Sequence, residues 1–403
     1  MIPIYIGIVL LQLLVFFVKT DLFKWRRRSS LVIIFLSLTM GIFLSTALPV
    51  LTFRTAGTHN VSIQDFQIVD VTRKEFFSQD EEDNRDFSLR VYYPTSSKKS
   101  ANTSYFLDWE AIRPTFDKKL GWPDFMLNYL RLFSLEASQG KEIREGEYPI
   151  VFYSHGLANN YTEASGRLLK IASKGYVVAA LNHSYSSDFA RLKSGKIVNY
   201  AHDSFLGKPI RQVDSLKTII AQQWVDDVKS TIEYLKESKI AKSIDFSKIC
   251  LIGFSAGGTM ALMGAEQIEN VRLVINLDGT PRGLKNYQNF PVPVLMMYSE
   301  KESFTDSQLK AWRVSREQIE APQQLIDSRT AEILKGAPKK SKAKRINGIK
   351  HTNFIEYPLI SPFSHYLGIG GEVDSKEFYD TLNSEIFMFF DENLKDSRQV
   401  MHK

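Results

Sequence analysis

A short stretch from residue 250 to 263 places a serine where it could act as a nucleophile. It reads ICLIGFSAGGTMAL, so that an apolar run leads into Gly253, Ser255 and Gly257, and small residues follow. A serine hydroxyl is a weak nucleophile until a neighbouring base takes its proton and a third group orients that base. Glycines permit a sharp strand-to-helix turn, and the first helical amide, here that of Ala256, can then stabilise an oxyanion. The pattern predicts a catalytic Ser255, with a purely structural turn as the alternative.

A histidine base should follow the serine, because such turns are accompanied by the chain order nucleophile, acid, base. Three histidines come after Ser255, namely His351, His365 and His402. His402 is the penultimate residue, and no strand-like run precedes His365. His351 ends the short strand-like run KRINGIKH, and a loop just past a strand is where the base is needed. We expect His351 to be the base, with a surface histidine as the alternative.

Two carboxylates are candidates for the acid that orients this base. Asp278 ends the apolar run VRLVINLD, and Glu300 ends PVPVLMMYSE. A position after the seventh strand of such a sheet is the commoner place for the acid, which favours Glu300. Asp278 follows the longer apolar run, so its carboxylate should emerge half-buried beside the serine. The residues alone leave both candidates open.

The oxyanion needs a second backbone amide, and the segment YSHGLANN (153–160) can supply it. We expect a strand to end at Ser154, after which His155 and Gly156 turn the chain away from it. Backbone N–H groups in such a turn can converge on a substrate carbonyl. His155 precedes Ser255 in the chain, and we therefore expect it to position the loop and not to act as the base.

The elements that would hold these residues alternate between two kinds of pattern. Five apolar runs rich in β-branched residues are expected to be strands: 148–155, 175–183, 248–254, 271–278 and 291–299. Helical patterns cover 163–174, 213–237 and 375–394. Near-continuous apolar strands separated by helices predict a mostly parallel sheet covered on both faces, in one α/β domain.

Two segments interrupt the alternation. Residues 108–136 are rich in aromatic side chains, and the part from Pro123 is predicted to form an amphipathic helix. The residues predicted to share its apolar face are Phe125, Met126, Tyr129, Leu130 and Phe133. This helix either packs on the sheet or acts as a lid or lipid-facing element beside the site. Residues 301–337 are predicted to be a polar helical insertion in which no catalytic or binding motif is recognisable.

The distribution of charge and the cysteine content limit the kinds of partner and cofactor that we expect. The 403 residues carry a net charge of +6, and the charges are scattered except in the basic run Lys339–Arg345. We expect that run to be a solvated loop or to touch anionic lipid, and we expect no nucleic-acid partner. The single Cys250 cannot form an internal disulfide. No ligand cluster predicts a metal, and no cofactor is expected.

The N-terminus predicts a membrane anchor. Residues 2–18 and 31–53 are two apolar stretches, and the loop between them contains Arg26, Arg27 and Arg28. The positive-inside rule keeps this loop cytoplasmic, so the chain after residue 54 should face outward at the cell membrane. We thus expect an anchor over 1–54 and the α/β domain over 55–403. A cleaved signal peptide is the alternative.

Several motifs in the same order make residues 85–395 resemble the platelet-activating factor acetylhydrolase family of α/β-hydrolases, in its plasma and intracellular type II form. The motifs are VFYSHGLANN, GYVVAALNHSYSSD, GFSAGG, INLDG, IKHTNF and GIGGEVDS. The resemblance implies the α/β-hydrolase fold, Ser255 as nucleophile and His351 as base. It also implies Asp278 as the acid in preference to Glu300.

The resemblance further implies that the amides of Leu157 and Ala256 bind the oxyanion. The implied activity is hydrolysis of carboxyl esters, with phospholipids that carry short or oxidised acyl chains as substrates. Residues 254 and 256 depart from the family, which usually has His and Phe there; this chain has Phe254 and Ala256. The departure alters the acyl pocket and leaves the substrate open. A broad carboxylesterase or lipase is one alternative, and a non-catalytic membrane-tethered binding protein is another.

Overall fold

The computed structural model describes residues 32, 34–41, 48–98, 102–106, 108–120, 127–205, 208, 210–301, 306 and 316–394. Its strands are β1 (Thr52–Phe53), β2 (Asn60–Lys74), β3 (Asn84–Thr95), β4 (Thr103–Ser104), β5 (Ser134–Leu135), β6 (Ser138–Gln139), β7 (Tyr148–Ser154), β8 (Val177–Asn182), β9 (Ala190–Arg191), β10 (Ile197–Val198), β11 (Ile244–Phe254), β12 (Val271–Leu277), β13 (Val294–Tyr298) and β14 (Lys342–Arg345). Its α-helices are α3 (Trp109–Leu120), α5 (Ser165–Ser173), α6 (Ile210–Lys236), α7 (Ala256–Gly264), α9 (Arg316–Gly336) and α10 (Ser375–Leu394). Short 3₁₀ helices are η2 (Asn128–Leu132), η3 (Tyr161–Ala164), η4 (His202–Ser204), η5 (Ala241–Ser243), η6 (His351–Phe354) and η7 (Tyr357–Ile360).

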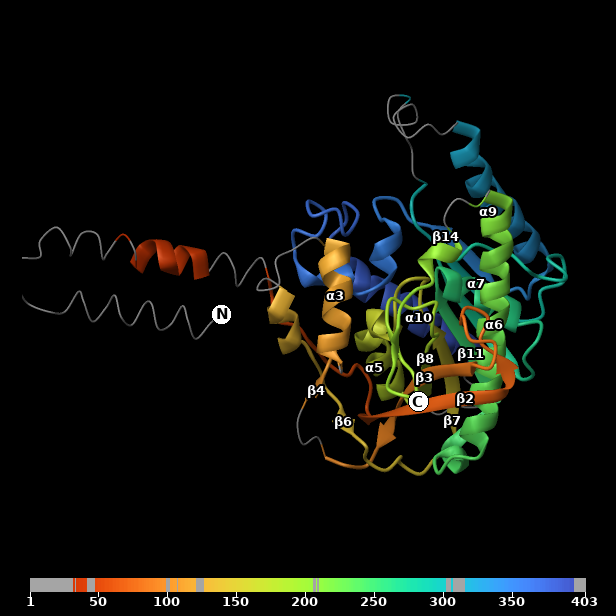
Figure 1. Cartoon of the computed structure of the whole chain (residues 1–403), viewed down its shortest axis with the longest axis horizontal. Coiled ribbons are helices and arrows are strands. Elements are labelled where there is room, and N and C mark those ends of the chain that lie inside the picture. Colours follow the sequence, from red (N-terminus) through yellow and green to blue (C-terminus); the bar gives the residue numbers. More distant parts are fainter. Residues whose placement is uncertain are drawn as a thin grey trace, which may run out of the picture.

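A nine-stranded sheet forms the centre of the molecule (Figure 1). Its strand order is β14-β13-β12-β11-β7-β8-β3-β2-β6, and the six strands from β14 to β8 run parallel. The strand β3 pairs antiparallel with both β8 and β2. The five apolar runs fall on β7, β8, β11, β12 and β13, so the predicted mostly parallel sheet is confirmed.

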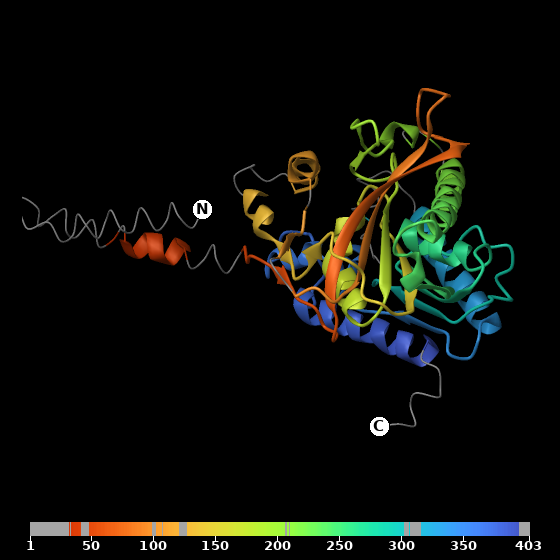
Figure 2. The ribbon, with the colours of Figure 1, turned by 90° about the horizontal axis from the view of Figure 1, so that it is seen from below.

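Helices cover both faces of this sheet, as the near-continuous apolar strands predict (Figure 2). On one face, Leu168 of α5 and Ile386 of α10 belong to one buried cluster. On the other face, Trp224 of α6, Met260 of α7 and Ile333 of α9 belong to a second cluster. The helices predicted at 163–174, 213–237 and 375–394 correspond to α5, α6 and α10.

The aromatic segment 108–136 differs from the single amphipathic helix predicted from Pro123. It contains α3 and the short 3₁₀ helix η2, and residues 121–126, with Phe125 and Met126, lie outside the described residues. Tyr129, Leu130 and Phe133 are buried in the core beside the sheet, and the Tyr129 hydroxyl donates to the Ile360 carbonyl at 2.9 Å. The apolar pattern therefore marks core contacts, and in the described part it is a 3₁₀ turn that makes them.

The basic run at 339–345, expected as a solvated loop, is partly a strand. Residues 342–345 form β14, which pairs parallel with β13 at the edge of the sheet. Lys342 and Lys344 point outward and form ion pairs with Glu392 and Glu385 of α10, at 2.8 and 3.3 Å. Charged side chains protect an exposed sheet edge from pairing with another chain, which explains how so basic a run can be a strand.

The N-terminal predictions are only partly within the described chain. The predicted span 2–18 lies outside it, as does much of 31–53; residues 34–41 are helical. Phe53, at the end of the second predicted span, instead lies in strand β1 and is buried in the domain core. Within the described ranges, no helix is both long enough and apolar enough to cross a bilayer.

Candidate active site

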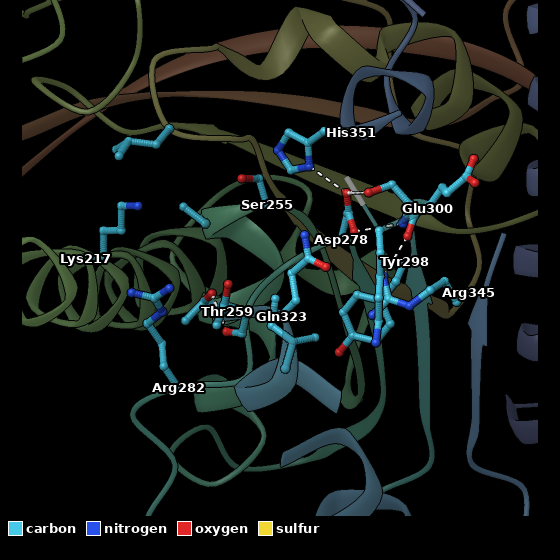
Figure 3. Close-up of a pocket in the computed structure, with 16 residues that line it drawn as sticks. Lys217, Ser255, Thr259, Asp278, Arg282, Tyr298, Glu300, Gln323, Arg345 and His351 are labelled. Atoms are coloured by element: carbon cyan, nitrogen blue, oxygen red, sulfur yellow. Dashed lines mark hydrogen bonds and ion pairs between the residues drawn. The ribbon is translucent and has the colours of Figure 1, made fainter. Parts of the chain in front are cut away.

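The carboxyl ends of five neighbouring strands bring the predicted site residues together. The strands β7, β11, β12, β13 and β14 lie side by side and parallel, so the loops that follow them meet at one edge of the sheet. Leu157, Ser255, Asp278, Glu300 and His351 line the same cavity, whose volume is about 370 Å³ (Figure 3). Residues that are far apart in the sequence thus share one pocket.

Ser255 lies at a strained turn between β11 and α7. Its φ and ψ are 54° and −116°, in a region that side-chain-bearing residues rarely adopt. The turn is possible because neighbouring backbones approach closely: a Cβ added to Gly253 would lie 2.0 Å from the Gly257 carbonyl oxygen. The Ser255 amide donates to the Leu277 carbonyl at 2.8 Å, which fixes the turn to β12. The glycines flanking Ser255 are therefore required by packing.

Two backbone segments supply amides beside Ser255. Ala256 is the first residue of α7, and the first amides of a helix have no partner within the helix. Leu157 follows β7 in a loop that is held at both ends. The Gly156 amide donates to Glu163 Oε1 at 3.0 Å, and the Ala158 amide donates to the Ser186 carbonyl at 2.9 Å. The Leu157 amide is thus carried on a backbone that is fixed on either side.

Asp278 and His351 form a hydrogen-bonded pair. His351 Nδ1 lies 2.7 Å from Asp278 Oδ2, and Ser299 donates its amide and hydroxyl to the same carboxylate at 2.9 and 2.7 Å. The Asp278 side chain is 11% exposed and that of His351 is 46% exposed. Burial alone would raise the pKa of Asp278, but the hydrogen bonds from His351 and Ser299 hold that pKa below its ordinary value. Asp278 therefore stays ionised beside the imidazole.

Glu300 does not contact His351 but holds the loop that carries it. The Gly348 amide donates to Glu300 Oε2 at 2.7 Å, and the Glu300 amide donates to the Ile349 carbonyl at 3.2 Å. Of the other candidate histidines, His365 is exposed on a separate loop against Tyr366, and His402 lies outside the described residues. The residues alone left the choice between Asp278 and Glu300 open, and the structure pairs Asp278 with His351.

Phe254, one of the two departures from the family pattern, packs against His351, the predicted base. Its ring centroid lies 4.5 Å from that of His351, and the side chain is 1% exposed. Within the described chain, Ser255 and His351 are not joined by a hydrogen bond. Such nucleophile–base contacts are often long before a substrate binds. Because its ring packs against that of His351, Phe254 limits the positions that the imidazole can take.

A second Ser–His–Asp arrangement, which the sequence patterns did not reveal, lies buried behind the loop of Leu157. Ser154 Oγ is 2.9 Å from His183 Nε2, and His183 Nδ1 is 2.7 Å from Asp227 Oδ2. The three residues are fully buried, and the His183 ring stacks on Trp224 at 4.1 Å. The His183 amide donates to His155 Nε2 at 3.1 Å, so His155 is part of this support and is not among the residues that line the cavity of Ser255. We call Ser154, His183 and Asp227 the buried triad.

Two arginines neutralise the carboxylate of the buried triad. Arg85 donates to both Asp227 oxygens, at 3.0 and 2.7 Å, and Arg73 donates to one of them at 2.7 Å. Burial would raise the pKa of Asp227, but Arg85 and His183 hold it well below its ordinary value. Burial lowers the pKa of His183 to about 4. His183 is thus neutral near pH 7, and its hydrogen bonds are fixed.

The far wall of the cavity is formed by α9, the helix of the predicted insertion. Gln323 and Ile326 of α9 line the cavity beside Arg345. Asp327 joins this wall to the sheet, because it pairs with Arg345 at 2.7 Å and with Lys301 at 2.5 Å. The insertion therefore shapes the pocket, which its polar sequence did not indicate. Among the described residues, no group of three or more His, Cys, Asp or Glu side chains is arranged to hold a metal ion.

Two family models match consecutive parts of the chain. Platelet-activating factor acetylhydrolase, isoform II, matches residues 54–198, and BD-FAE matches residues 214–354. The first match includes the loop of Leu157, and the second includes Ser255, Asp278 and His351. The resemblance to platelet-activating factor acetylhydrolases is thus confirmed for the first part of the domain, and the pocket residues fall within the second match.

Known proteins show the same likeness over most of the chain. The platelet-activating factor acetylhydrolase of Canis lupus familiaris is 24% identical over 77% of this chain and 72% of its own length. That of Cavia porcellus is 23% identical, with 77% and 73% covered. A ferulic acid esterase from Streptomyces cinnamoneus superposes with a TM-score of 0.66 at 17% identity, over 87% of this chain and 95% of its own. The chain has the α/β-hydrolase fold and is similar to platelet-activating factor acetylhydrolases.

Proposed function

We propose that the protein is a serine hydrolase of carboxyl esters. The observation that carries this proposal is the combination of Ser255 at a strained turn with a hydrogen-bonded His351–Asp278 pair in the same cavity. Strained backbone of this kind persists where the surrounding structure fixes a residue for a task. A serine, a histidine and a carboxylate in this order of contact form the minimal set for acyl transfer.

The proposed reaction passes through an acyl-enzyme. With His351 Nδ1 bonded to Asp278, His351 Nε2 is left to take the proton of Ser255 as the hydroxyl attacks the ester carbonyl. The imidazolium then gives that proton to the leaving alkoxide. Water, deprotonated by the same nitrogen, attacks the acyl-serine and releases the acid. Asp278 stabilises the imidazolium in both halves of the reaction.

The amides of Ala256 and Leu157 are the proposed donors to the oxyanion of each tetrahedral intermediate. Both residues line the cavity beside Ser255, and the positive end of α7 adds a favourable potential there. The role needs backbone N–H groups only, so the alanine at residue 256 keeps it. Loss of one such donor costs about 10²–10³-fold in turnover in related chemistry.

The proposed substrates are phospholipids with short or oxidised acyl chains. This is supported by the similarity to platelet-activating factor acetylhydrolases across 77% of the chain. A broader carboxylesterase is the second candidate, favoured by the BD-FAE match across the pocket residues. Phe254 and Ala256 flank the nucleophile and would shape the acyl pocket in either case.

Hydrolysis assays with the full chain separate these candidates. Phosphatidylcholines with sn-2 chains of two to sixteen carbons should be compared with p-nitrophenyl esters of the same acids, and Ser255→Ala serves as the control. A phospholipase should favour the short-chain phospholipids over the matched p-nitrophenyl esters. Equal or better cleavage of simple esters would support the broad carboxylesterase. No hydrolysis of any ester by folded protein would contradict both and favour a non-catalytic binding protein.

We further propose that residues 2–18 and the part of 31–53 that precedes β1 anchor the protein in the cell membrane with the hydrolase domain outside. The support is the sequence: two apolar stretches separated by a loop with three consecutive arginines. Protease added to intact cells should remove the domain, and the protein should stay with the membrane fraction in alkaline carbonate. Protection of the domain in intact cells would contradict the orientation, and release by carbonate would contradict the anchor.

A further inference from the structure

The cavity that contains Ser255 has a cationic side. Lys217 of α6 and Arg282, in the loop after β12, line it together with Thr259 and Thr280. In Figure 3 the Lys217 and Arg282 side chains lie on the opposite side of Ser255 from Asp278. The ester-cleaving groups and these two cations therefore occupy the two sides of one pocket.

Of the two cations, only Arg282 has an ion-pair partner among the described residues. Arg282 Nη1 donates to Asp214 Oδ1 at 2.8 Å, and within the described chain Lys217 forms no ion pair. Asp214 is 53% exposed, whereas the Arg282 side chain is 14% exposed. On this side of the cavity, two cations thus have one carboxylate as ion-pair partner. On the opposite wall, Lys301 and Arg345 pair with Asp327.

The surroundings hold Arg282 in place. Arg329 of α9 donates to the carbonyl of Pro281, the preceding residue, at 2.9 Å. Gly283, the following residue, has a φ of 71° and packs close to Met263 of α7 and Thr218 of α6. The ion pair with Asp214 fixes the guanidinium from one side, and Arg282, which lines the cavity, has further N–H donors. Three helices thus fix this loop and its arginine.

Lys217, on α6, is only partly exposed and lies close to Arg282. Its side chain is half-buried, and burial together with the adjacent Arg282 lowers its pKa. An anion bound between the two groups would relieve this repulsion and restore a counter-charge. Charge-assisted hydrogen bonds to an oxyanion are about twice as strong as neutral ones.

We propose that Lys217 and Arg282 form a subsite for an oxyanion group, a carboxylate or a phosphate, carried by the substrate next to its scissile ester. This inference rests on the proposed ester hydrolysis and specifies the substrate: an ester with a negative charge within reach of Ser255. A carboxylate would arrive at the free end of the acyl chain, as in an acyl group shortened by oxidation. A phosphate would arrive on the glycerol side.

The test compares matched esters that differ in this charge. For the acyl side, the mono-p-nitrophenyl ester of glutaric acid is compared with p-nitrophenyl valerate. For the glycerol side, 1-alkyl-2-acetylglycerol 3-phosphate is compared with 1-alkyl-2-acetylglycerol. The wild-type chain should prefer the anionic member of one pair by at least about tenfold in kcat/KM, and added salt should reduce that preference.

Charge-removing variants identify the residues. In Lys217→Met/Arg282→Gln the ratio of kcat/KM for the anionic and neutral members should fall about 10- to 100-fold, whereas Lys217→Arg should keep most of it. Lys236→Met removes a charge from α6 at a residue that is 48% exposed and outside the cavity, and it should leave the ratio unchanged. An unchanged ratio in the double variant would overturn the subsite.

A binding measurement keeps this result separate from the catalytic proposal. The same esters are titrated into the full-length Ser255→Ala chain, with and without the two charge-removing substitutions. Tighter binding of the anionic member that disappears with the cations supports the subsite even if the wild-type chain hydrolyses nothing, an outcome that would contradict only the proposed function. Equal binding of both members in both pairs would overturn the subsite even if every ester is hydrolysed.

Discussion

The molecule contains two Ser–His–Asp arrangements with the same histidine–aspartate distance and opposite surroundings. In the pocket, His351 bonds Asp278 at 2.7 Å, the imidazole is 46% exposed, and the Ser255 backbone is strained. In the buried triad, His183 bonds Asp227 at the same 2.7 Å, and all three side chains are fully buried. Residue type and the histidine–aspartate distance therefore do not distinguish them.

The two arrangements differ in solvent access and in whether the serine hydroxyl is already hydrogen-bonded. The Ser154 hydroxyl is already hydrogen-bonded to His183, and two arginines fix the carboxylate behind it. Ser255 lines a cavity, and the His351 imidazole beside it is partly exposed and can accept a proton. The buried triad supports the loop that carries Leu157, through the contact between His183 and His155. We interpret the arrangement around Ser255 as catalytic and the buried triad as structural, and five predictions test this interpretation.

Removal of the two serines should give the largest contrast. Ser255→Ala should lower turnover of any ester substrate about 10⁴- to 10⁶-fold, because no nucleophile remains. Ser154→Ala should lower it less than about tenfold, because the loop keeps its other contacts. Steady-state hydrolysis of a p-nitrophenyl ester measures both. Comparable losses in the two variants would remove the distinction between the arrangements.

The two acidic candidates should also separate. Asp278→Asn should reduce kcat about 10⁴-fold, because the amide favours the wrong imidazole tautomer. Glu300→Gln should reduce it about tenfold or less, since Glu300 holds only the Gly348 turn before His351. The two variants are assayed side by side with the same ester. A larger loss in Glu300→Gln would overturn the assignment of Asp278.

Stability should show the opposite order. Asp227→Asn breaks the buried ion pairs with Arg73 and Arg85, which among the described residues keep only Asp70 and Glu75 as ion-pair partners, and should lower the free energy of unfolding by about 3–5 kcal/mol. Asp278→Asn removes a partner from a half-exposed histidine and should cost about 1 kcal/mol or less. Urea titrations followed by tryptophan fluorescence measure both. Equal costs would show that the buried network is not the more structural of the two.

The buried histidine should make stability depend on pH. Because burial lowers the folded-state pKa of His183 to about 4 from its ordinary 6.5, the unfolded chain takes up a proton in this window that the folded chain does not. Stability should therefore fall as the pH drops from 6.5 to 4, by up to about 1.4 kcal/mol per pH unit from this residue. In His183→Gln that share of the slope should be absent. An unchanged slope between the two proteins would contradict a neutral buried His183.

The smallest expected effect concerns the Phe254 ring beside the His351 imidazole. Phe254→Leu removes the aromatic contact with His351 and should lower kcat about two- to tenfold, given that such contacts contribute about 0.5–1.5 kcal/mol. KM should change less than kcat, because the ring contacts the base. Steady-state kinetics resolve the two constants. A change confined to KM would instead assign Phe254 to substrate binding.

The sheet and the pocket were predictable where they depend on local patterns. The apolar runs of β7, β8, β11, β12 and β13 are continuous because both faces of these strands are covered, so they stand out in the sequence. The turn at Ser255 was recognisable because close packing there admits only glycine at Gly253 and Gly257. Chain order then left three histidines, and the strand-like run before His351 favoured it as the base. These features are written in short stretches of sequence.

Other features depend on contacts that the sequence does not display. Asp278 and Glu300 each follow a strand, and only the packing of the His351 loop decides which one contacts it. Arg85 and Asp227 are 142 residues apart, so no spacing signals the buried network. The sequence pattern placed Tyr129 on the apolar face of a predicted α-helix, but tertiary contacts with the core produce a 3₁₀ turn there. Long-range contacts set these outcomes.

The most direct test of the central claim is covalent labelling of the two serines. The full-length protein is treated with a fluorophosphonate, which reacts with activated serine hydroxyls, and the modified peptide is identified by mass spectrometry. The account predicts one adduct, on Ser255, that disappears in Ser255→Ala and persists in Ser154→Ala. An adduct on Ser154, or undiminished labelling of Ser255→Ala, would contradict it.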